Sequence, residues 1–215
     1  MNFNGMKQKP AQMIAVLSLA LMLGAPACYA ADGPAQSGAE QATREQTMQQ
    51  QTAGSKWAFG GEIDALPFVM NGYYGSGFVG RDGWKFRAVA ARSTLPSFMV
   101  TDGFRDKRSD AYALLADRFI GSKRQKLEGL WVGGGGEYWR SRIRTDASPT
   151  YANYHNYMLT VGGGYAWNLS RHLYINPWAA GHFAVAGERN ILVSGKTYKQ
   201  PVFTPEGSIK LGFTF

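Results

Sequence analysis

Side-chain character alternates residue by residue along the end of the chain, from residue 203 to residue 215. The odd positions are Phe203, Pro205, Gly207, Ile209, Leu211, Phe213 and Phe215. The even positions hold both charges of the segment, Glu206 and Lys210, among threonine, serine and glycine. Because successive side chains of a β-strand point to opposite faces, this pattern predicts a strand with one apolar and one polar face.

Composition narrows the fold class further. The chain has 215 residues, with 27 glycines and 13% aromatic residues. So many aromatic side chains can bury ample apolar surface, which excludes intrinsic disorder for most of the chain. Beyond residue 30 there is no run of about 18 apolar residues, the length that a membrane-spanning helix needs. A β-barrel, either soluble or transmembrane, remains.

The first thirty residues have the pattern of a secretory signal peptide. Lys7 and Lys9 precede an apolar run over residues 13–24, and Cys28 and Ala30 place small side chains before a cleavage site. Cleavage after Ala30 would remove the only cysteine, which suits an oxidising compartment. An alternative is a lipoprotein acylated at Cys28.

Residues 31–55 are rich in glutamine and small residues and contain no aromatic side chain. Such a segment cannot anchor a core, so it is predicted to be a flexible periplasmic tether. The predicted organisation is therefore a signal peptide over 1–30, this tether over 31–55, and a barrel over 56–215.

Alternation and turn residues together predict eight strands. They span residues 57–67, 73–81, 84–95, 110–120, 128–142, 153–167, 172–186 and 201–215. Short connections alternate with long ones, and an even number of strands places both termini of the barrel on the same side of the membrane. We therefore expect a closed antiparallel up-and-down barrel with periplasmic termini and long outer loops. The parity of 73–81 stays open, and 110–120 could equally be an amphipathic helix.

The last strand, SIKLGFTF, ends on the aromatic residue Phe215. It resembles the final strand of bacterial outer-membrane β-barrel proteins, and the chain resembles the small eight-stranded members in general build. It departs from them at Lys210, where glycine is frequent. The resemblance implies the outer membrane of a Gram-negative bacterium, and recognition of the strand ending at Phe215 by the barrel-assembly machinery. A soluble lipocalin-like periplasmic lipid binder, with its apolar face inward, is an alternative.

Charged residues recur on the face predicted to line the lumen. They are Glu62, Asp64, Lys85, Arg87, Asp117, Glu137, Glu206 and Lys210, with Trp178 on the same face. Side chains fill an eight-stranded barrel, so we expect a packed polar network that serves stability, without a general pore. Closing the first strand on the last, with Trp57 opposite Phe215, predicts an ion pair between Glu62 and Lys210.

His182 and Glu206 are weak catalytic candidates, and enzymatic activity stays open. Pairing of the last two strands places Glu206 beside His182, and a carboxylate that orients an imidazole is half of a general-base arrangement. The resembled family includes lipid A acyl-chain enzymes, although Ala184 replaces the serine of a His-x-Ser pattern. Pro177 and Pro205 lie in neighbouring strands, where they could weaken the seam and admit lipid.

The net charge of +8 suggests an anionic partner. Arg140, Arg142 and Arg144 share one strand face with Tyr138, at the predicted outer rim. Arg105, Lys107 and Arg108 add charge in the neighbouring predicted loop. Arginine suits bidentate phosphate contact, so these residues are predicted to contact lipopolysaccharide; a merely solvated basic rim is the alternative.

Other motifs indicate no cofactor or metal. The glycines over 75–80 match G-x-G-x-x-G but lie outside any βαβ unit, and those over 133–136 lack a following lysine. Nucleic acid is not an expected partner of a secreted membrane protein. The sequence predicts a monomeric membrane barrel of structural or interaction type, with a lipid A-modifying enzyme as the alternative.

Overall fold

The computed structural model describes residues 56–215. The predicted signal peptide and tether lie outside the described residues. Within the described part of the chain, no helix has both the length and the apolar character needed to cross a membrane.

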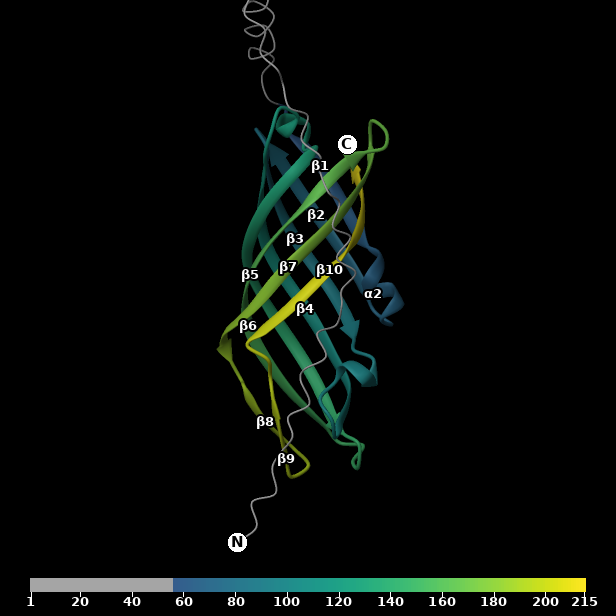
Figure 1. The fold of residues 1–215 in the computed structure, drawn as a ribbon, viewed down its shortest axis with the longest axis vertical. Helices are drawn as coiled ribbons and strands as arrows, with labels where there is room; N and C mark the ends of the chain where they lie inside the picture. The colour runs from purple at the N-terminus through teal and green to yellow at the C-terminus, as the bar shows by residue number, and fades with distance from the viewer. Residues whose placement is uncertain (1–55) are drawn as a thin grey trace, which may run out of the picture. The chain divides into compact units, whose positions relative to one another are not determined.

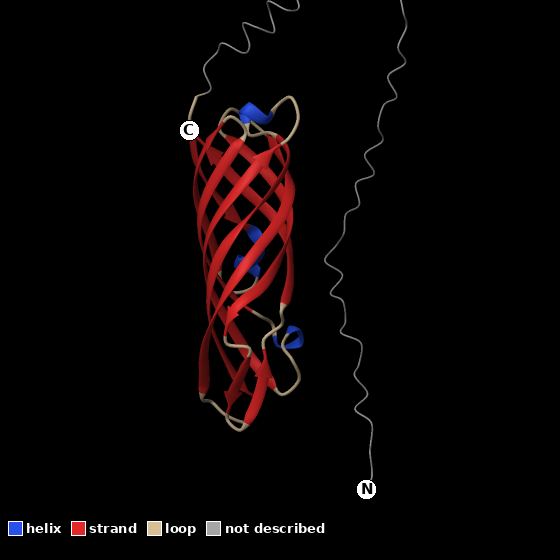
Figure 2. Ribbon diagram, turned by 90° about the vertical axis from the view of Figure 1, so that its left-hand side faces the viewer, coloured by secondary structure: helices blue, strands red, loops and turns tan. Residues whose placement is uncertain are grey.

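Eight antiparallel strands close into a barrel in the order β1-β10-β7-β6-β5-β4-β3-β2, which confirms the predicted architecture (Figures 1 and 2). A separate two-stranded hairpin lies in the last long connection. The barrel strands are β1 (Ala58–Asp64), β2 (Tyr73–Arg81), β3 (Trp84–Thr94), β4 (Phe104–Phe119), β5 (Gly129–Thr145), β6 (Tyr151–Asn168), β7 (Leu173–Gly187) and β10 (Phe203–Thr214). The remaining elements are helix α2 (Ala65–Val69), the hairpin strands β8 (Asn190–Val193) and β9 (Lys196–Lys199), and two short 3₁₀ turns, Ser97–Met99 and Arg124–Lys126.

The two ends of the barrel differ. The turn end carries Asp82-Gly83, residues 120–128 and residues 169–172, together with the start and end of the described chain. The loop end carries the other connections, including the β8–β9 hairpin. Residues 110–119 belong to strand β4, so the helical alternative is wrong. Strand β2 points its odd-numbered residues outward, because Tyr74 and Phe78 are buried.

Several boundaries differ from the sequence prediction. Strand β1 ends at Asp64, whose carboxylate accepts a hydrogen bond from the Leu66 backbone N–H (3.0 Å) and so caps α2. Pro67 lacks an N–H and cannot continue a strand ladder. Strands β4 and β5 extend further toward the loop end than predicted, and the predicted loop over 187–200 folds into the β8–β9 hairpin.

Apolar side chains face outward and polar ones inward. Phe86, Leu114 and Ile209 are exposed on the outer wall, whereas Lys85 and Asp117 are almost fully buried in the lumen. This is the distribution of a barrel whose wall faces lipid, since a soluble barrel would bury its apolar face. The lipocalin-like alternative, which needs an apolar interior, is therefore wrong.

Aromatic side chains border the apolar wall. Trp84 and Trp167 lie toward the turn end, and Tyr138 and Tyr157 lie toward the loop end. The stretch of β6 from Tyr157 to Trp167, at about 3.3 Å per residue and a tilt of about 40°, spans about 25 Å. That matches the apolar band of membrane barrels.

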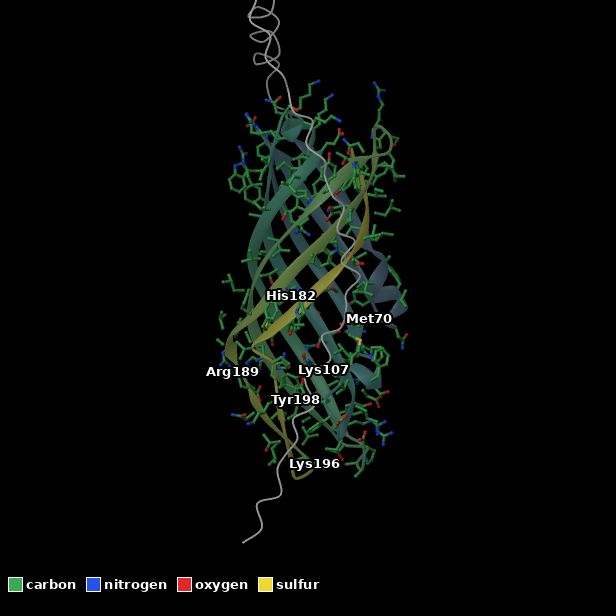
Figure 3. The ribbon with its side chains drawn as sticks, viewed as in Figure 1. Met70, Lys107, His182, Arg189, Lys196 and Tyr198 are labelled. Carbon is green, nitrogen blue, oxygen red and sulfur yellow. The ribbon has the colours of Figure 1, made fainter. Side chains whose placement is uncertain are left out.

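The loop end is closed by an apolar cluster that the sequence did not indicate. It consists of Val100, Phe104, Ile143, Tyr154, Ile191, Val193 and Tyr198. Lys107 points into this cap, where its ammonium donates a hydrogen bond to Gln200 Oε1 (3.2 Å) and lies over the Tyr198 ring. Figure 3 shows Lys107 and Tyr198 at this end of the barrel.

Burial lowers the pKa of Lys107 from 10.5 to about 8, because removal from water disfavours the ammonium. Between those two values the unfolded chain binds more protons than the folded one, so the free energy of unfolding is expected to rise with pH. Burial raises the pKa of Tyr154 and of Tyr198, so these groups stay protonated in the folded protein across this window.

We expect urea titrations of the detergent-solubilised barrel to show this rise between pH 8 and pH 10. The variant Lys107→Met should show a smaller slope than the unaltered barrel, because one group that titrates in this range is gone. Equal slopes in the two proteins would contradict the prediction.

Candidate functional site

Four charged side chains pair inside the lumen. This lumenal ion cluster consists of Glu62 of β1, Lys85 and Arg87 of β3, and Asp117 of β4. Lys85 Nζ lies 2.8 Å from Glu62 Oε1. Arg87 donates from Nε and Nη2 to the two carboxylate oxygens of Asp117, at 2.7 and 2.9 Å. Two positive and two negative groups thus neutralise one another in a buried space.

Neutral side chains complete the packing around the lumenal ion cluster. The Tyr174 hydroxyl donates to Glu62 Oε1 (2.7 Å), and the Tyr74 hydroxyl accepts from Arg87 Nη1 (3.2 Å). The Trp131 ring, 2% exposed, fills the lumen beside them and donates from Nε1 to Asn176 Oδ1 (2.9 Å). Four of the eight inward charges predicted from strand parity are therefore brought together here.

The predicted ion pair between Glu62 and Lys210 is wrong. In the β1–β10 ladder, Asp64 lies opposite Lys210 and Gly212 opposite Glu62, a shift of two residues from the predicted register. In this register β1 and β10 approach closely at Gly60, where a Cβ would collide with the backbone oxygen of Phe213. Among the described residues no carboxylate lies within 4 Å of the Lys210 ammonium.

Lys210 and Asp64 each find other partners. The Lys210 ammonium lies 3.8 Å from the centre of the Trp178 ring, a cation–π contact. Asp64 accepts hydrogen bonds from Trp178 Nε1 (2.7 Å) and from the Ser208 hydroxyl (2.5 Å). Trp178 thus joins Lys210 and Asp64 within the predicted network.

A second lumenal cluster surrounds His182, nearer the loop end (Figure 3). His182 Nε2 lies 3.1 Å from a Glu206 carboxylate oxygen, so the predicted neighbourhood of these side chains is confirmed. His182 Nδ1 lies 2.9 Å from the Thr160 hydroxyl and 3.4 Å from Glu137 Oε1. Sequence reasoning missed Thr160 and the contact with Glu137, because both depend on pairing across β5, β6 and β7.

The β7–β10 seam, in contrast, is continuous. Strand pairing runs without a break from Phe203 opposite Phe183 to Phe213 opposite Leu173, and it includes both Pro177 and Pro205. The register has no shift at these prolines, whose rings both lie on the lipid-facing parity. That they weaken the seam and admit lipid stays a hypothesis.

Arginines from three strands gather on the outer wall at the loop end. This arginine rim consists of Arg92 of β3, Arg108 of β4, and Arg140, Arg142 and Arg144 of β5. Arg108 is directly opposite Arg142 in the β4–β5 ladder, and Asp110 is opposite both Arg92 and Arg140. The rim begins two residues beyond the Tyr112–Tyr138 pair toward the loop end, at the border of the apolar wall.

Two acidic residues neutralise part of the arginine rim. Arg92 forms an ion pair with Asp110, and its hydrogen bond holds the pKa of Asp110 below the ordinary value. Arg144 donates from Nε to Asp106 (2.6 Å), which raises the pKa of Arg144. Within residues 56–215, no carboxylate lies within 4 Å of the guanidinium groups of Arg108, Arg140 and Arg142.

The arginine rim encloses a hollow of about 410 Å³ on the outer wall. Its lining includes Tyr73, Arg92, Asp106, Arg108, Arg142 and Tyr151. The Arg142 guanidinium lies 4.8 Å from the centre of the Tyr151 ring, which holds the arginine in place. The site is concave, basic and bordered by aromatic rings.

The structure redistributes the predicted basic residues. Arg108 lies on strand β4 and not in a loop, and it joins Arg140, Arg142 and Arg144 on one face. Lys107 is 6% exposed and points into the loop-end cap, so it cannot contact a lipid from the rim. Arg105 pairs with Asp146 beside the rim.

Sequence reasoning missed three residues that line this hollow, namely Arg92, Tyr73 and Tyr151. They come from three other strands, and no local pattern connects them with Arg142. Within residues 56–215, no group of three or more histidine, cysteine or acidic side chains is arranged to hold a metal ion.

The chain matches no protein-family model and no curated protein. It is similar to the solved N-terminal β-barrel domain of OprF from Pseudomonas aeruginosa, with 11% identity and a TM-score of 0.47, covering 75% of this chain and 98% of that one. It is also similar to Neisserial surface protein A (NspA), with 10% identity and a TM-score of 0.42, covering 74% of this chain and 95% of that one. The barrel architecture described above rests on the strand pairing of this chain itself.

The lumenal ion cluster predicts a large stability effect at Lys85. The variant Lys85→Met leaves a negative charge without its partner in the lumen, which costs about 3–5 kcal/mol of unfolding free energy. Urea titration of the detergent-solubilised barrel measures the loss. Lys123→Met is the matched control, because Lys123 also pairs with a glutamate, Glu128, but its own side chain is largely exposed to water. Equal losses in the two variants would contradict the stabilising role of the cluster.

Proposed function

We propose that this protein is a small outer-membrane β-barrel of structural or interaction type that binds lipopolysaccharide through its arginine rim. The observation that carries the proposal is the pairing of Arg108 with Arg142, directly opposite each other in the β4–β5 ladder without a carboxylate within 4 Å among the described residues. Like charges placed directly opposite in a sheet destabilise it. An anion between the two guanidinium groups would remove that repulsion.

Phosphate fits this position by charge and geometry. A guanidinium presents a planar fork of donors that matches phosphate oxygens in a bidentate manner. Arg108 and Arg142 both line the hollow of about 410 Å³, with Tyr73 and Tyr151 beside them. The arginine rim lies just beyond the aromatic border of the apolar wall, at the height where lipid phosphates meet water.

The proposed topology places the loop end outside the cell and the turn end in the periplasm, in a Gram-negative outer membrane. The loops of membrane barrels are longer on the outer side, and the longer connections of this chain share one end. Phe215 is 79% exposed at the turn end, which leaves it accessible to an assembly machinery in the periplasm.

A role as a general pore is not part of this proposal. The lumenal ion cluster and the Trp131 ring fill the lumen toward the turn end, and the apolar cluster lies at the loop end. An eight-stranded barrel is just wide enough for side chains to fill. The proposed role therefore lies on the outer wall and the loops.

A second candidate function is modification of lipid A acyl chains. The chain of contacts from the Thr160 hydroxyl through His182 to Glu206 favours it, because a hydroxyl, an imidazole and a carboxylate in sequence resemble a nucleophile with its base and orienting group. Thr160 is 5% exposed and His182 is 4% exposed, so a substrate would have to enter the lumen.

The arginine rim can be tested by removing the opposed charges. The double variant Arg108→Gln/Arg142→Gln is expected to lower the affinity for lipopolysaccharide by about tenfold or more, because two charge-assisted contacts are lost. The readouts are the lipopolysaccharide that co-purifies per barrel and the affinity for added lipopolysaccharide in detergent micelles. The control Arg124→Gln/Arg171→Gln removes the same charge at the turn end. Unchanged binding in the rim variant would overturn the proposal.

The enzymatic alternative has its own test. If the His182 cluster acts on lipid A, then His182→Ala should change the lipid A mass spectrum of cells that make the protein, relative to cells that make the unaltered barrel. Thr160→Val should give the same spectrum as His182→Ala, since each variant breaks the contact between the Thr160 hydroxyl and the His182 imidazole. Identical spectra for the variants, the unaltered protein and a strain without the gene would exclude this activity.

A further inference from the structure

A second hollow lies on the lipid-facing wall, over β2 and the three strands that carry the arginine rim. This wall hollow has a volume of about 560 Å³ and is lined mainly by apolar atoms of β2, β3, β4 and β5. Its floor is formed by Gly77, Ala88, Ala116 and Gly134, and Phe86 and Leu114 form its sides. Leu114 stands out from the wall with 73% of its surface exposed.

Strand register explains the shape of the wall hollow. Gly77 lies opposite Ala88, and Ala116 lies opposite Gly134, so outward positions with small or absent side chains meet across the strands. On β6 and β7 small outward residues also occur, with Gly163 opposite Ala179, but Leu159 lies opposite Phe183 two rows away. On β2–β5 the small outward residues meet in the wall hollow.

The arginine rim and the wall hollow lie along the same outer faces of β3 and β4. On β3 the outward residues are Arg92, then Ala90, then Ala88, so about 13 Å of strand separates the rim arginine from the floor of the wall hollow. On β4, Arg108 and Leu114 share the outer face in the same way. A lipid held by its phosphate at the arginine rim would direct an acyl chain along this path.

Gly77 shows that the hollow is not a requirement of barrel closure. A Cβ built on Gly77 meets no atom within 4 Å, and the same holds for Gly136 beside the wall hollow. Neither residue has a positive φ, so no backbone conformation demands glycine there. By contrast, a Cβ on Gly134 would lie 2.6 Å from the Thr160 backbone oxygen. Glycine weakens a strand, and at Gly77 its structural effect is to keep the wall hollow open.

We propose that the wall hollow binds one acyl chain of the same lipopolysaccharide molecule whose phosphate occupies the arginine rim. This inference rests on the proposed function. Surrounding lipid offers an acyl chain similar apolar surroundings, so the gain comes from close contact with a concave wall. The phosphate contact holds the lipid in place, and the wall hollow then favours a lipid whose chain runs directly below its headgroup.

The test fills the wall hollow without altering the arginine rim. Ala88→Leu places a larger apolar side chain on its floor, and Ala179→Leu makes the same change on the outward face of β7, away from the hollow. Two probes are used: lipid A carrying its phosphates and acyl chains, in phosphatidylcholine nanodiscs that hold the barrel, and its fully deacylated phosphorylated disaccharide in solution. Heat-modifiable migration on gels verifies that each variant is folded, and Gly77→Leu is a second filling variant if Ala88→Leu fails to fold.

We expect Ala88→Leu to lower the affinity for acylated lipid A by about fivefold, the loss of several close carbon contacts, and to leave binding of the deacylated disaccharide unchanged. Ala179→Leu should change neither affinity. Unchanged affinity of Ala88→Leu for acylated lipid A would overturn the acyl-chain inference, as would an equal loss for both probes.

Failure of the proposed function would look different. The variant Arg108→Gln/Arg142→Gln should lose affinity for both probes, because both carry the phosphates. If it binds both probes as well as the unaltered barrel does, then the arginine rim is not a phosphate site, and the acyl-chain inference falls with it.

Discussion

Lys85 and Arg87 enter the lumen from β3 and meet Glu62 of β1 and Asp117 of β4, so that buried charges of both signs neutralise one another. A barrel in lipid must point its apolar side chains outward, and the alternate residues are then forced inward. Those inward residues are polar here, and burial of unpaired charges would cost several kcal/mol each. Charge pairing in the lumen is thus what permits an apolar outer wall.

On the outer wall, in contrast, some arginines have no carboxylate partner among the described residues. In the lumen each arginine or lysine of the ion cluster has a carboxylate within hydrogen-bonding distance, whereas on the wall Arg108 and Arg142 face each other without one among the described residues. The arginine rim and the wall hollow lie on one side of the barrel, over β2–β5. The wall is therefore asymmetric, and the proposed lipid contact rests on this one side.

Much of the fold could be predicted because strand parity is a local property. The alternation along β10 and β5 correctly separated outward residues such as Leu130 from inward ones such as Glu137. The boundaries were harder to predict. The end of β1 depends on the capping of α2 by Asp64, and the β8–β9 hairpin depends on apolar contacts with distant residues of the loop-end cap.

The sequence by itself determined the eight-stranded alternation, the inward charges and the basic face of β5, since each requires only the spacing of neighbours along one strand. Only the tertiary structure decided which charges meet. Glu62 pairs with Lys85 and not with Lys210, and Arg108 comes to lie opposite Arg142, because register is set by contacts between distant strands. A shift of two residues keeps every side chain on its face but changes every partner.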